Sequence, residues 1–288
     1  MMENAVHPFL LDDLDIRGAV VRFDAVWQQL LSNRNYPEAV IELLGQMSAT
    51  TLLLAHNLKQ PGRLTIQLRG NGPVSLLVID CNETLNIRCM AQHGDNIQAA
   101  SMIDLMGQGQ LLLSLDLPSM REPYQSIVPL VGENIAQIFE HYLTQSEQLA
   151  SRFFLAATPT GAAGLFLQKM PTTDQRDADG WARVEALAST VKSEELLAFP
   201  AEELLTRLFH EETVRVFPAL PVTNNVPEDW EKIGNMLLTL GREEVYGVLK
   251  ERGEIVIRDD LGNREYRFDK AAIDELFSRT PETPPSVH

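Results

Sequence analysis

Two cysteines are the residues whose chemistry depends most directly on spacing. Cys81 and Cys89 are the only thiols in the chain, and a thiol pair can form a disulfide or enter a metal site. They fall in a predicted hairpin whose turn is centred near Glu83, so Cys81 should face residue 85 or 86. Cys89 would lie three or four residues farther along its strand, roughly 10–13 Å away, which exceeds the span of a disulfide. We interpret both as ordinary sheet cysteines, with a redox role as the alternative.

Other residue types with catalytic or ligand chemistry lack a productive spacing. The histidines, among them His56, His93, His141 and His210, show no HExxH or other close ligand pattern. Residues 70–73 (GNGP) resemble a phosphate-binding loop only superficially, because they join two predicted strands and no helix follows. No nucleophile-elbow or Walker motif is present. The sequence therefore predicts no catalytic residue, no bound cofactor and no enzymatic reaction; a hydrolase or transferase with a dispersed site is the alternative.

The charge balance and hydropathy exclude several partners. A formal net charge of -16 opposes binding to nucleic acid, whose affinity for proteins comes mainly from Lys and Arg. No apolar run approaches the roughly 18–20 residues needed to span a bilayer. The N-terminus is acidic at Asp12, Asp13 and Asp15, unlike a signal peptide. We expect a cytoplasmic protein that binds neither nucleic acid nor a membrane.

Hydrophobic periodicity predicts an α+β fold. Apolar residues three to four apart predict helices within residues 19–54, and alternating residues with turn signals predict a sheet after them. The expected strands are residues 64–68, 74–79, 85–90, 111–115, 126–130, 152–156 and 165–169, with a helix at 135–149. We expect residues 1–171 to form an N-terminal domain with a mixed sheet and flanking helices.

Residues 172–222 are predicted to form a helical connecting region. A polar loop at 172–180 precedes helices at 181–191 and 193–199, with Ser193 as a cap, and a further helix follows Pro200. An apolar stripe runs along these helices. This connecting-region stripe consists of Leu196, Leu197, Phe199, Leu204, Leu205, Leu208 and Phe209. Either it docks the helices onto the N-terminal sheet, or, once undocked, it exposes apolar surface that binds other proteins.

Residues 223–288 are predicted to form a small C-terminal α+β module. Pro227 is placed in the first turn of a helix that ends at Gly241, and a second helix follows at 243–250. Residues 260–263 (DLGN) form the turn of a hairpin, and a helix at 271–277 closes the module.

Four stretches resemble the heat-shock protein 33 family in both order and spacing. They are residues 56–59 (HNLK) with 62–73, residues 124–130, residues 140–142 (EHY) with 146–149 (SEQL), and residues 162–164 (AAG) through 168–171 (QKMP). The connecting region is similar too, at residues 194–197 (EELL) and 208–212 (LFHEE). The likeness covers residues 8–277.

The resemblance implies an N-terminal α+β domain, a metastable helical linker and a C-terminal module in which cysteines of a CxC and a CxxC pair hold zinc. In that family oxidation releases the metal, unfolds the linker and exposes client-binding surface. The implied function is that of an ATP-independent holdase, which binds unfolded proteins under stress and passes them to ATP-driven refolding chaperones. The resemblance also suggests a homodimer.

The zinc ligands of the family are replaced in this sequence. Val226 and Glu228 align with the CxC pair, and Arg258 and Leu261 align with the CxxC pair. None of these residues can supply a thiolate, and Arg258 would repel a cation. We therefore expect a module without zinc.

Loss of a structural zinc requires a replacement, because the ion supplies roughly 10–16 kcal/mol to small domains that need it to fold. Burial of a large apolar side chain contributes roughly 1.5–3 kcal/mol, so about four to ten such side chains could compensate. The candidates are Trp230, Ile233, Leu237, Leu240, Val245, Leu249, Ile255, Ile257, Tyr266, Phe268, Ile273 and Leu276. We expect them to form an ordinary apolar core.

Two hypotheses for function follow. The first is a holdase without the zinc and thiol switch, either constitutive or triggered by heat or another stress that loosens the connecting region. The second is an adaptor or scaffold that kept the fold and binds one specific folded partner. A heterogeneous set of clients would favour the first, and a single stoichiometric partner the second.

Overall fold

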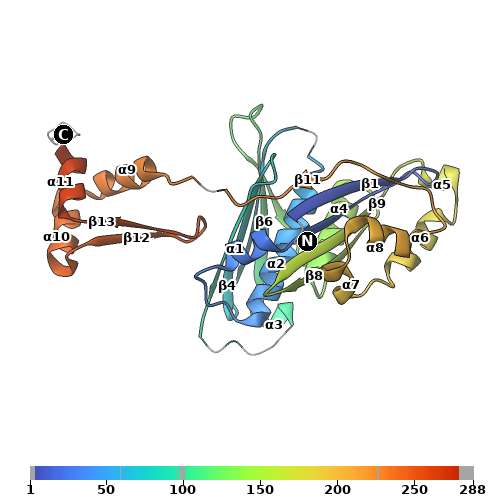
Figure 1. Ribbon diagram of the computed structural model, residues 1–288, viewed down its shortest axis with the longest axis horizontal. Helices are drawn as coiled ribbons and strands as arrows, with labels where there is room; N and C mark the ends of the chain where they lie inside the picture. Colours follow the sequence, from blue (N-terminus) through green and yellow to red (C-terminus); the bar gives the residue numbers. More distant parts are fainter. Residues whose placement is uncertain (1–3, 59, 96, 98–100, 226, 279–288) are drawn as a thin grey trace. The chain divides into compact units, whose positions relative to one another are not determined.

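The computed structural model describes residues 4–58, 60–95, 97, 101–225 and 227–278, and the chain divides into two compact units, residues 1–225 and 226–288 (Figure 1). Helices account for 37% of the described residues and strands for 32%, which confirms the predicted α+β class. Residues 172–222 belong to the first unit. The division into three domains stays a prediction.

The first unit contains two antiparallel sheets instead of the expected mixed sheet. In the first sheet the order is β10-β1-β2-β9-β8, and β11 also pairs with β1. Its strands are β1 (Asn4–Leu11), β2 (Ile16–Phe23), β8 (Ser151–Thr158), β9 (Gly161–Lys169), β10 (Val214–Val216) and β11 (Leu220–Pro221). Short connections such as residues 159–160 explain why the strands are antiparallel, because a tight turn can join only antiparallel neighbours.

The second sheet has the strand order β5-β4-β3-β6-β7 and is also antiparallel. Its strands are β3 (Arg63–Gly70), β4 (Val74–Asn82), β5 (Ile87–His93), β6 (Gly109–Asp116) and β7 (Tyr124–Val128). The turn predicted at residues 70–73 joins β3 to β4. Strand β7 was predicted at residues 126–130 and lies two residues earlier, because Val128 is its final residue paired with β6.

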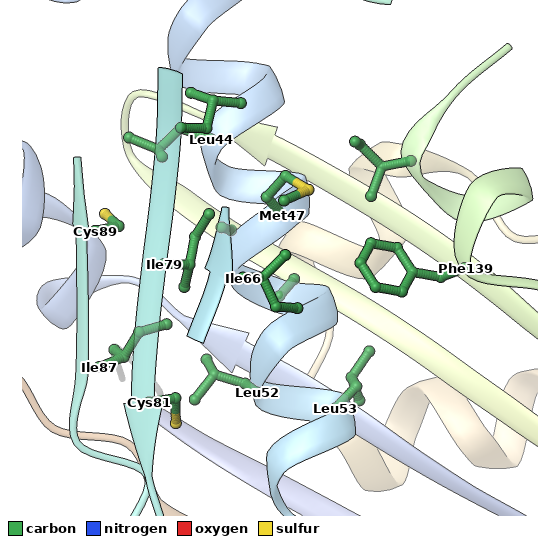
Figure 2. Close-up of a cluster of buried hydrophobic side chains, with 14 of the residues drawn as sticks. Leu44, Met47, Leu52, Leu53, Ile66, Ile79, Cys81, Ile87, Cys89 and Phe139 are labelled. Atoms are coloured by element: carbon green, nitrogen blue, oxygen red, sulfur yellow. The ribbon is translucent and has the colours of Figure 1, made fainter. Parts of the chain in front are cut away.

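The central helix α2 (Glu38–Ala55) contacts strands of both sheets. Figure 2 shows Met47 and Leu52 of this helix among side chains of the second sheet, including Ile66 and Ile79. A helix that is apolar around most of its circumference must be buried. By length and mean hydropathy α2 also passes as a candidate membrane span, which was not expected; 67% of it is buried within the protein, as in a core helix.

The remaining helices of the N-terminal part are α1 (Ala25–Leu31), α3 (Met102–Met106) and α4 (Ile135–Ser146). Asn134 begins α4 by accepting a hydrogen bond from the Gln137 backbone N–H at 3.0 Å, which satisfies one of the unpaired donors of the first turn. α4 packs against β8, and it ends three residues before the predicted limit.

The prediction of helix from residue 19 is wrong, because Ala19 lies in strand β2. Val21 and Phe23 belong to the core around α2, whereas Ile16 and Val20 contact the connecting region on the other face of the sheet. A strand that is covered on both faces reads as a continuous apolar run without alternation. The same effect hides β1, which the sequence analysis did not predict.

The connecting region forms four short helices, α5 (Thr173–Arg176), α6 (Gly180–Ala188), α7 (Ser193–Ala198) and α8 (Ala201–Leu208). Ser193 does not cap α7, since it is already the first helical residue. The Lys192 backbone N–H instead donates to the Glu195 carboxylate at 2.9 Å. After α8 the chain returns to the first sheet through β10 and β11.

The second unit consists of α9 (Trp230–Leu240), α10 (Arg242–Arg252), β12 (Ile255–Asp259), β13 (Arg264–Phe268) and α11 (Lys270–Ser278). Gly241 ends α9 as predicted, with φ of 92°, a conformation that favours glycine. Pro227 lies before the helix, because the Asp229 side chain caps it by accepting the Lys232 N–H at 3.0 Å.

The core of the second unit is apolar, as expected. Its buried residues are Ile233, Leu237, Val245, Leu249, Ile255, Tyr266, Phe268 and Ile273, with Ile257 and Leu276 packed at its edge. Two predicted core residues are wrong: Trp230 is 47% exposed and Leu240 is 50% exposed. Leu240 is the last residue of α9, where the helix has already passed the core.

Candidate functional site

The connecting-region stripe lies against the outer face of the first sheet. Five of its side chains are buried and two, Leu197 and Phe199, are half-buried. The buried residues are Leu196, Leu204, Leu205, Leu208 and Phe209. The structure therefore brings the whole predicted stripe into one surface.

The stripe packs on apolar side chains of β1, β2 and β9. Leu11, Ile16 and Leu165 belong to the same buried cluster, and the rings of Phe9 and Phe209 lie 6.3 Å apart. This contact closes the outer face of the sheet, while α2 covers the inner face. Release of α7 and α8 would therefore expose two apolar surfaces at once, one on the helices and one on the strands.

Amphipathicity positions this stripe. In α8, the buried residue Leu208 lies four positions after Leu204 and three after Leu205, so the three leucines share one face. Glu203 and Arg207 occupy the opposite face and form an ion pair at 2.8 Å. Each buried leucine contributes about 1.5–3 kcal/mol to docking, whereas an exposed ion pair contributes at most about 1 kcal/mol.

Arginines tie the connecting region to the N-terminal part. Arg22 of β2 donates to the backbone oxygen of Ala198, the last residue of α7, at 2.8 Å. Arg215 of β10 pairs with Asp12 at 2.6 Å. Arg22 also pairs with Asp24 at 2.7 Å, and this ion pair fixes the orientation of the Arg22 side chain.

Arg152 of β8 lies between two carboxylates. It pairs with Glu185 of α6 at 2.6 Å and with Glu140 of α4 at 3.3 Å. Burial raises the pKa of Glu140, and the Phe153 backbone N–H, which donates to this carboxylate at 2.8 Å, opposes the shift. The guanidinium of Arg152 therefore links α6 to β8 and α4.

Within the connecting region, Arg183 of α6 pairs with Glu212 at 2.7 Å and with Asp177 at 2.9 Å. The hydrogen bond from Arg183 lowers the pKa of the Asp177 carboxyl. Both contacts hold the loops around α6 and α8 to each other, and neither crosses to the sheet.

The cysteines lie on the inner face of the second sheet. Cys81 faces Ile87 and Ile79 faces Cys89, so the predicted partner of Cys81, residue 85 or 86, is wrong. The turn is centred at Thr84 instead of Glu83, and Leu85 within it has φ of 55°. Cys89 is two residues beyond Ile87, the partner of Cys81, so the two cysteines are diagonal neighbours. Such neighbours lie about 7–8 Å apart, which exceeds the Cα separation that a disulfide spans without backbone movement.

Burial dominates the chemistry of both thiols. It raises the pKa of Cys81 to about 12, with the negative charge of Asp80 as a smaller cause, and the pKa of Cys89 to about 11. Because the thiolate is the reactive form, both groups stay protonated and unreactive near neutral pH. This geometry favours the interpretation as sheet cysteines.

The former ligand positions that the structure describes carry other contacts. Glu228 accepts the Trp230 indole N–H at 2.7 Å and pairs with Arg264 at 3.1 Å. Arg258 pairs with Asp260 at 3.5 Å, and Leu261 is half-buried. Val226 lies outside the described residues.

No group of three His, Cys, Asp or Glu side chains able to hold a metal occurs among the residues that the structure describes. The absence of zinc stays a prediction from the sequence. The ion pair between Glu228 and Arg264 joins the start of the second unit to its hairpin.

Sequence reasoning missed an aromatic cluster at the start of α9. The Trp230 ring meets Tyr266 edge to face with centroids 4.9 Å apart, and it meets Phe268 at 5.5 Å. The Tyr266 hydroxyl also accepts the Asp229 backbone N–H at 3.1 Å. The alternation of Tyr266 and Phe268 was the available signal, since it places both rings on one face of the hairpin.

Comparisons with known proteins agree on one family. The family model described as Hsp33 protein matches residues 4–269. The 33 kDa chaperonin of Methylobacillus flagellatus is 39% identical over 275 residues, which cover 95% of this chain and 94% of the relative. The 33 kDa chaperonin of Chromobacterium violaceum is 40% identical over 272 residues, covering 93% and 92%.

A solved structure has the same fold. The crystal structure of the 33 kDa chaperonin (heat shock protein 33 homolog) from Thermotoga maritima superposes with a TM-score of 0.82 and covers 96% of this chain and 98% of its own. The two sequences are 22% identical, so this likeness shows the fold alone.

Proposed function

The chain belongs to the Hsp33 family of chaperones, and from this premise we propose that it is an ATP-independent holdase whose activity needs no zinc or thiol switch. It binds unfolded or aggregation-prone proteins under stress and hands them to ATP-driven refolding chaperones. Its own working form is a cytoplasmic homodimer in this proposal. No covalent reaction is part of the activity.

The observation that carries the proposal is the docking of the connecting-region stripe. Leu204 and Leu205 are each 1% exposed, yet they belong to a helix of eight residues. An isolated helix of this length is not stable in water, so α8 depends on the sheet for its structure. Undocking would convert a buried seam into exposed apolar surface, which is the chemistry that holds unfolded chains.

The proposed independence from oxidants rests on the residues at the former ligand positions. None of Glu228, Arg258 and Leu261 can be oxidised to a disulfide, and Cys81 and Cys89 are buried with raised pKa values. Heat remains as a trigger, because local unfolding of weakly docked elements precedes global unfolding. If docking is already weak at the growth temperature, the protein is active without any trigger.

Light scattering of heat-denatured citrate synthase tests the proposal. We expect the protein to suppress aggregation equally before and after hydrogen peroxide treatment. A Leu205→Ala variant should suppress aggregation at a lower temperature, because removal of a buried leucine weakens docking by about 2–5 kcal/mol. An exposed Glu202→Gln change on the same helix serves as the control.

Two results would reject the proposal. Failure to suppress aggregation at any temperature would exclude the holdase. Suppression that requires peroxide would exclude the redox-independent mechanism.

A further inference from the structure

A hollow of about 610 Å³ lies in the first unit, between its two sheets and beyond the C-terminal end of α2. The first sheet contributes Arg17 and Gln168 to its wall, the second sheet contributes Leu113, and the end of α2 contributes Leu54. Because α2 ends at Ala55, no further turn of this helix fills the space between the sheets. Small-molecule sites have volumes of about 300–1,000 Å³, so the hollow is large enough to hold a ligand.

Most of the wall is apolar. Leucines of α2, the second sheet and α4 line it, together with Phe166 and Met170. Leu113 and Phe166 are buried, whereas Tyr124 is 53% exposed and marks where the hollow meets solvent. An apolar chain that displaces water from such a wall is bound favourably. The hollow therefore suits a ligand with a long apolar part.

One cation lies in this wall. Arg17 of β2 is half-buried, and its Nε donates to the Gln168 side-chain oxygen at 2.8 Å, while its Nη2 donates to the same atom. Among the residues that the structure describes, no carboxylate and no backbone oxygen accepts a hydrogen bond from Arg17. The guanidinium edge formed by Nη1 and Nη2 is therefore available, and such an edge matches the two oxygens of a carboxylate.

Gln168 fixes the orientation of this guanidinium. It is 1% exposed, and its side-chain amide nitrogen donates to Glu147 and to Ser151, each at 3.1 Å. Since both amide hydrogens are used, the amide oxygen is the atom that faces Arg17. This network orders the cation before a ligand arrives, which lowers the entropy that binding costs.

Glu147 is the other charged residue of the wall in the described part of the chain. It is exposed, so water and salt screen its charge, and no ion pair joins it to Arg17. Its carboxylate would repel an anion weakly. Removal of that charge should therefore strengthen the binding of an anionic ligand.

We propose that the hollow binds a fatty acid, with the carboxylate on the Nη1–Nη2 edge of Arg17 and the alkyl chain along the leucine wall. A half-buried cation without an anionic partner carries a desolvation cost, and a carboxylate compensates it. A polyphosphate ligand would need more cations than this one arginine. The inference goes beyond the proposed holdase function and does not depend on it.

Isothermal titration calorimetry of the full chain tests the proposal. The probe is dodecanoate below its micelle concentration, and dodecan-1-ol and dodecyltrimethylammonium carry the same alkyl chain without the negative charge. We expect one dodecanoate to bind per chain. The alcohol and the cation should bind at least about tenfold more weakly, because each lacks the charged hydrogen-bonded pair with Arg17.

Charge variants with a matched control test the role of the arginine. Arg17→Gln should weaken dodecanoate binding by about tenfold or more, and Glu147→Gln should strengthen it by about twofold. Arg69→Gln removes the same charge from an exposed residue of β3 that does not line the hollow, so it should leave the affinity unchanged. Thermal unfolding of each variant checks that it is folded.

A steric pair of variants locates the alkyl chain. Leu115 of β6 lines the hollow, so Leu115→Trp should fill it and abolish binding. Leu112 lies three residues earlier on the same strand, on the opposite face, and is half-buried as well, so Leu112→Trp is the control. Methyl NMR of the unmodified chain gives an independent location, with dodecanoate expected to shift the signals of Leu113 and Leu143.

Four outcomes would overturn the proposal. Equal binding of the alcohol would indicate apolar contact without recognition of the carboxylate, and shifts at Leu204 and Leu208 instead of the hollow would place the ligand on the connecting region. Displacement of dodecanoate by an apolar peptide with a free C-terminus, but not by its amide, would assign the hollow to chain ends of proteins. Absence of binding would show that the hollow holds no fatty acid.

Discussion

At the scale of single residues, burial controls the chemistry of Cys81 and Cys89. Their pKa values are raised to about 12 and about 11, so at pH 8 the thiolate fraction of each is very small. We predict that maleimide labels neither thiol in the native protein and labels both after denaturation. Intact mass measures the number of adducts. Rapid labelling of the native chain, or an internal disulfide after peroxide treatment, would contradict the buried placement.

His56, at the end of α2, makes stability depend on pH. Burial lowers its pKa from 6.5 to about 4, so the folded state binds the proton more weakly than the unfolded state. The chain therefore loses stability as the pH falls from about 6.5 toward 4, by up to about 3 kcal/mol from this group.

A His56→Gln variant should flatten this pH dependence. Urea unfolding midpoints at pH 7 and pH 5 measure the effect, and His210→Gln, at a residue whose side chain is 65% exposed, is the control. A wild-type loss between pH 7 and pH 5 that persists unchanged in His56→Gln would assign it to other groups.

The aromatic cluster of the second unit links residue chemistry to the fold of the module. Phe268 is 6% exposed and contacts Trp230, so Phe268→Ala should destabilise the second unit by about 3–5 kcal/mol. Val256→Ala, at a position that is 44% exposed, should cost less than about 0.5 kcal/mol. Thermal unfolding of the full chain measures both, and equal effects would deny the cluster a structural role.

At the scale of secondary-structure elements, docking of α8 sets how easily the connecting region opens. Leu204→Ala removes a side chain that is 1% exposed and should weaken docking by about 2–5 kcal/mol. We predict faster amide hydrogen exchange in α6, α7 and α8 with unchanged exchange in β3 and β4. Thr206→Ala on the exposed face of α8 is the control. Faster exchange throughout the first unit would mean that the region does not open separately.

The elements that the sequence predicted well are those with one exposed face. In α8 and in the β12–β13 hairpin, polar residues alternate with apolar ones at the period of the element, so the type of each element is readable. In β1 and β2 both faces are covered, by α2 on one side and by the connecting region on the other. No polar face marks the period there, and tertiary burial outweighs the local pattern.

The connecting-region stripe could be predicted from the sequence because α8, too, has one exposed polar face. The apolar spacing of Leu204, Leu205 and Leu208 identified the stripe, but nothing local indicated that Arg22 and Arg152, far away in the chain, hold the helices that carry it. The exposure of Trp230 was also unreadable, because an apolar residue at a helix start has the same pattern whether it faces the core or solvent.

At the scale of the whole molecule, the two units have different sources of stability. The first unit carries the connecting region packed on the outer face of its first sheet. The second unit has a core of eight buried apolar and aromatic residues where its relatives are expected to use a metal. The central claim is that this core makes zinc unnecessary and that, since Cys81 and Cys89 both belong to the first unit, the second unit has no thiol for an oxidant to act on.

Zinc content of the purified full-length protein, measured by inductively coupled plasma mass spectrometry, tests this claim most directly. Small domains that depend on structural zinc bind it tightly enough to retain it through purification. We predict far less than one zinc per chain in a protein whose second unit is folded. One zinc per chain would show that other ligands hold the metal, and it would contradict the account.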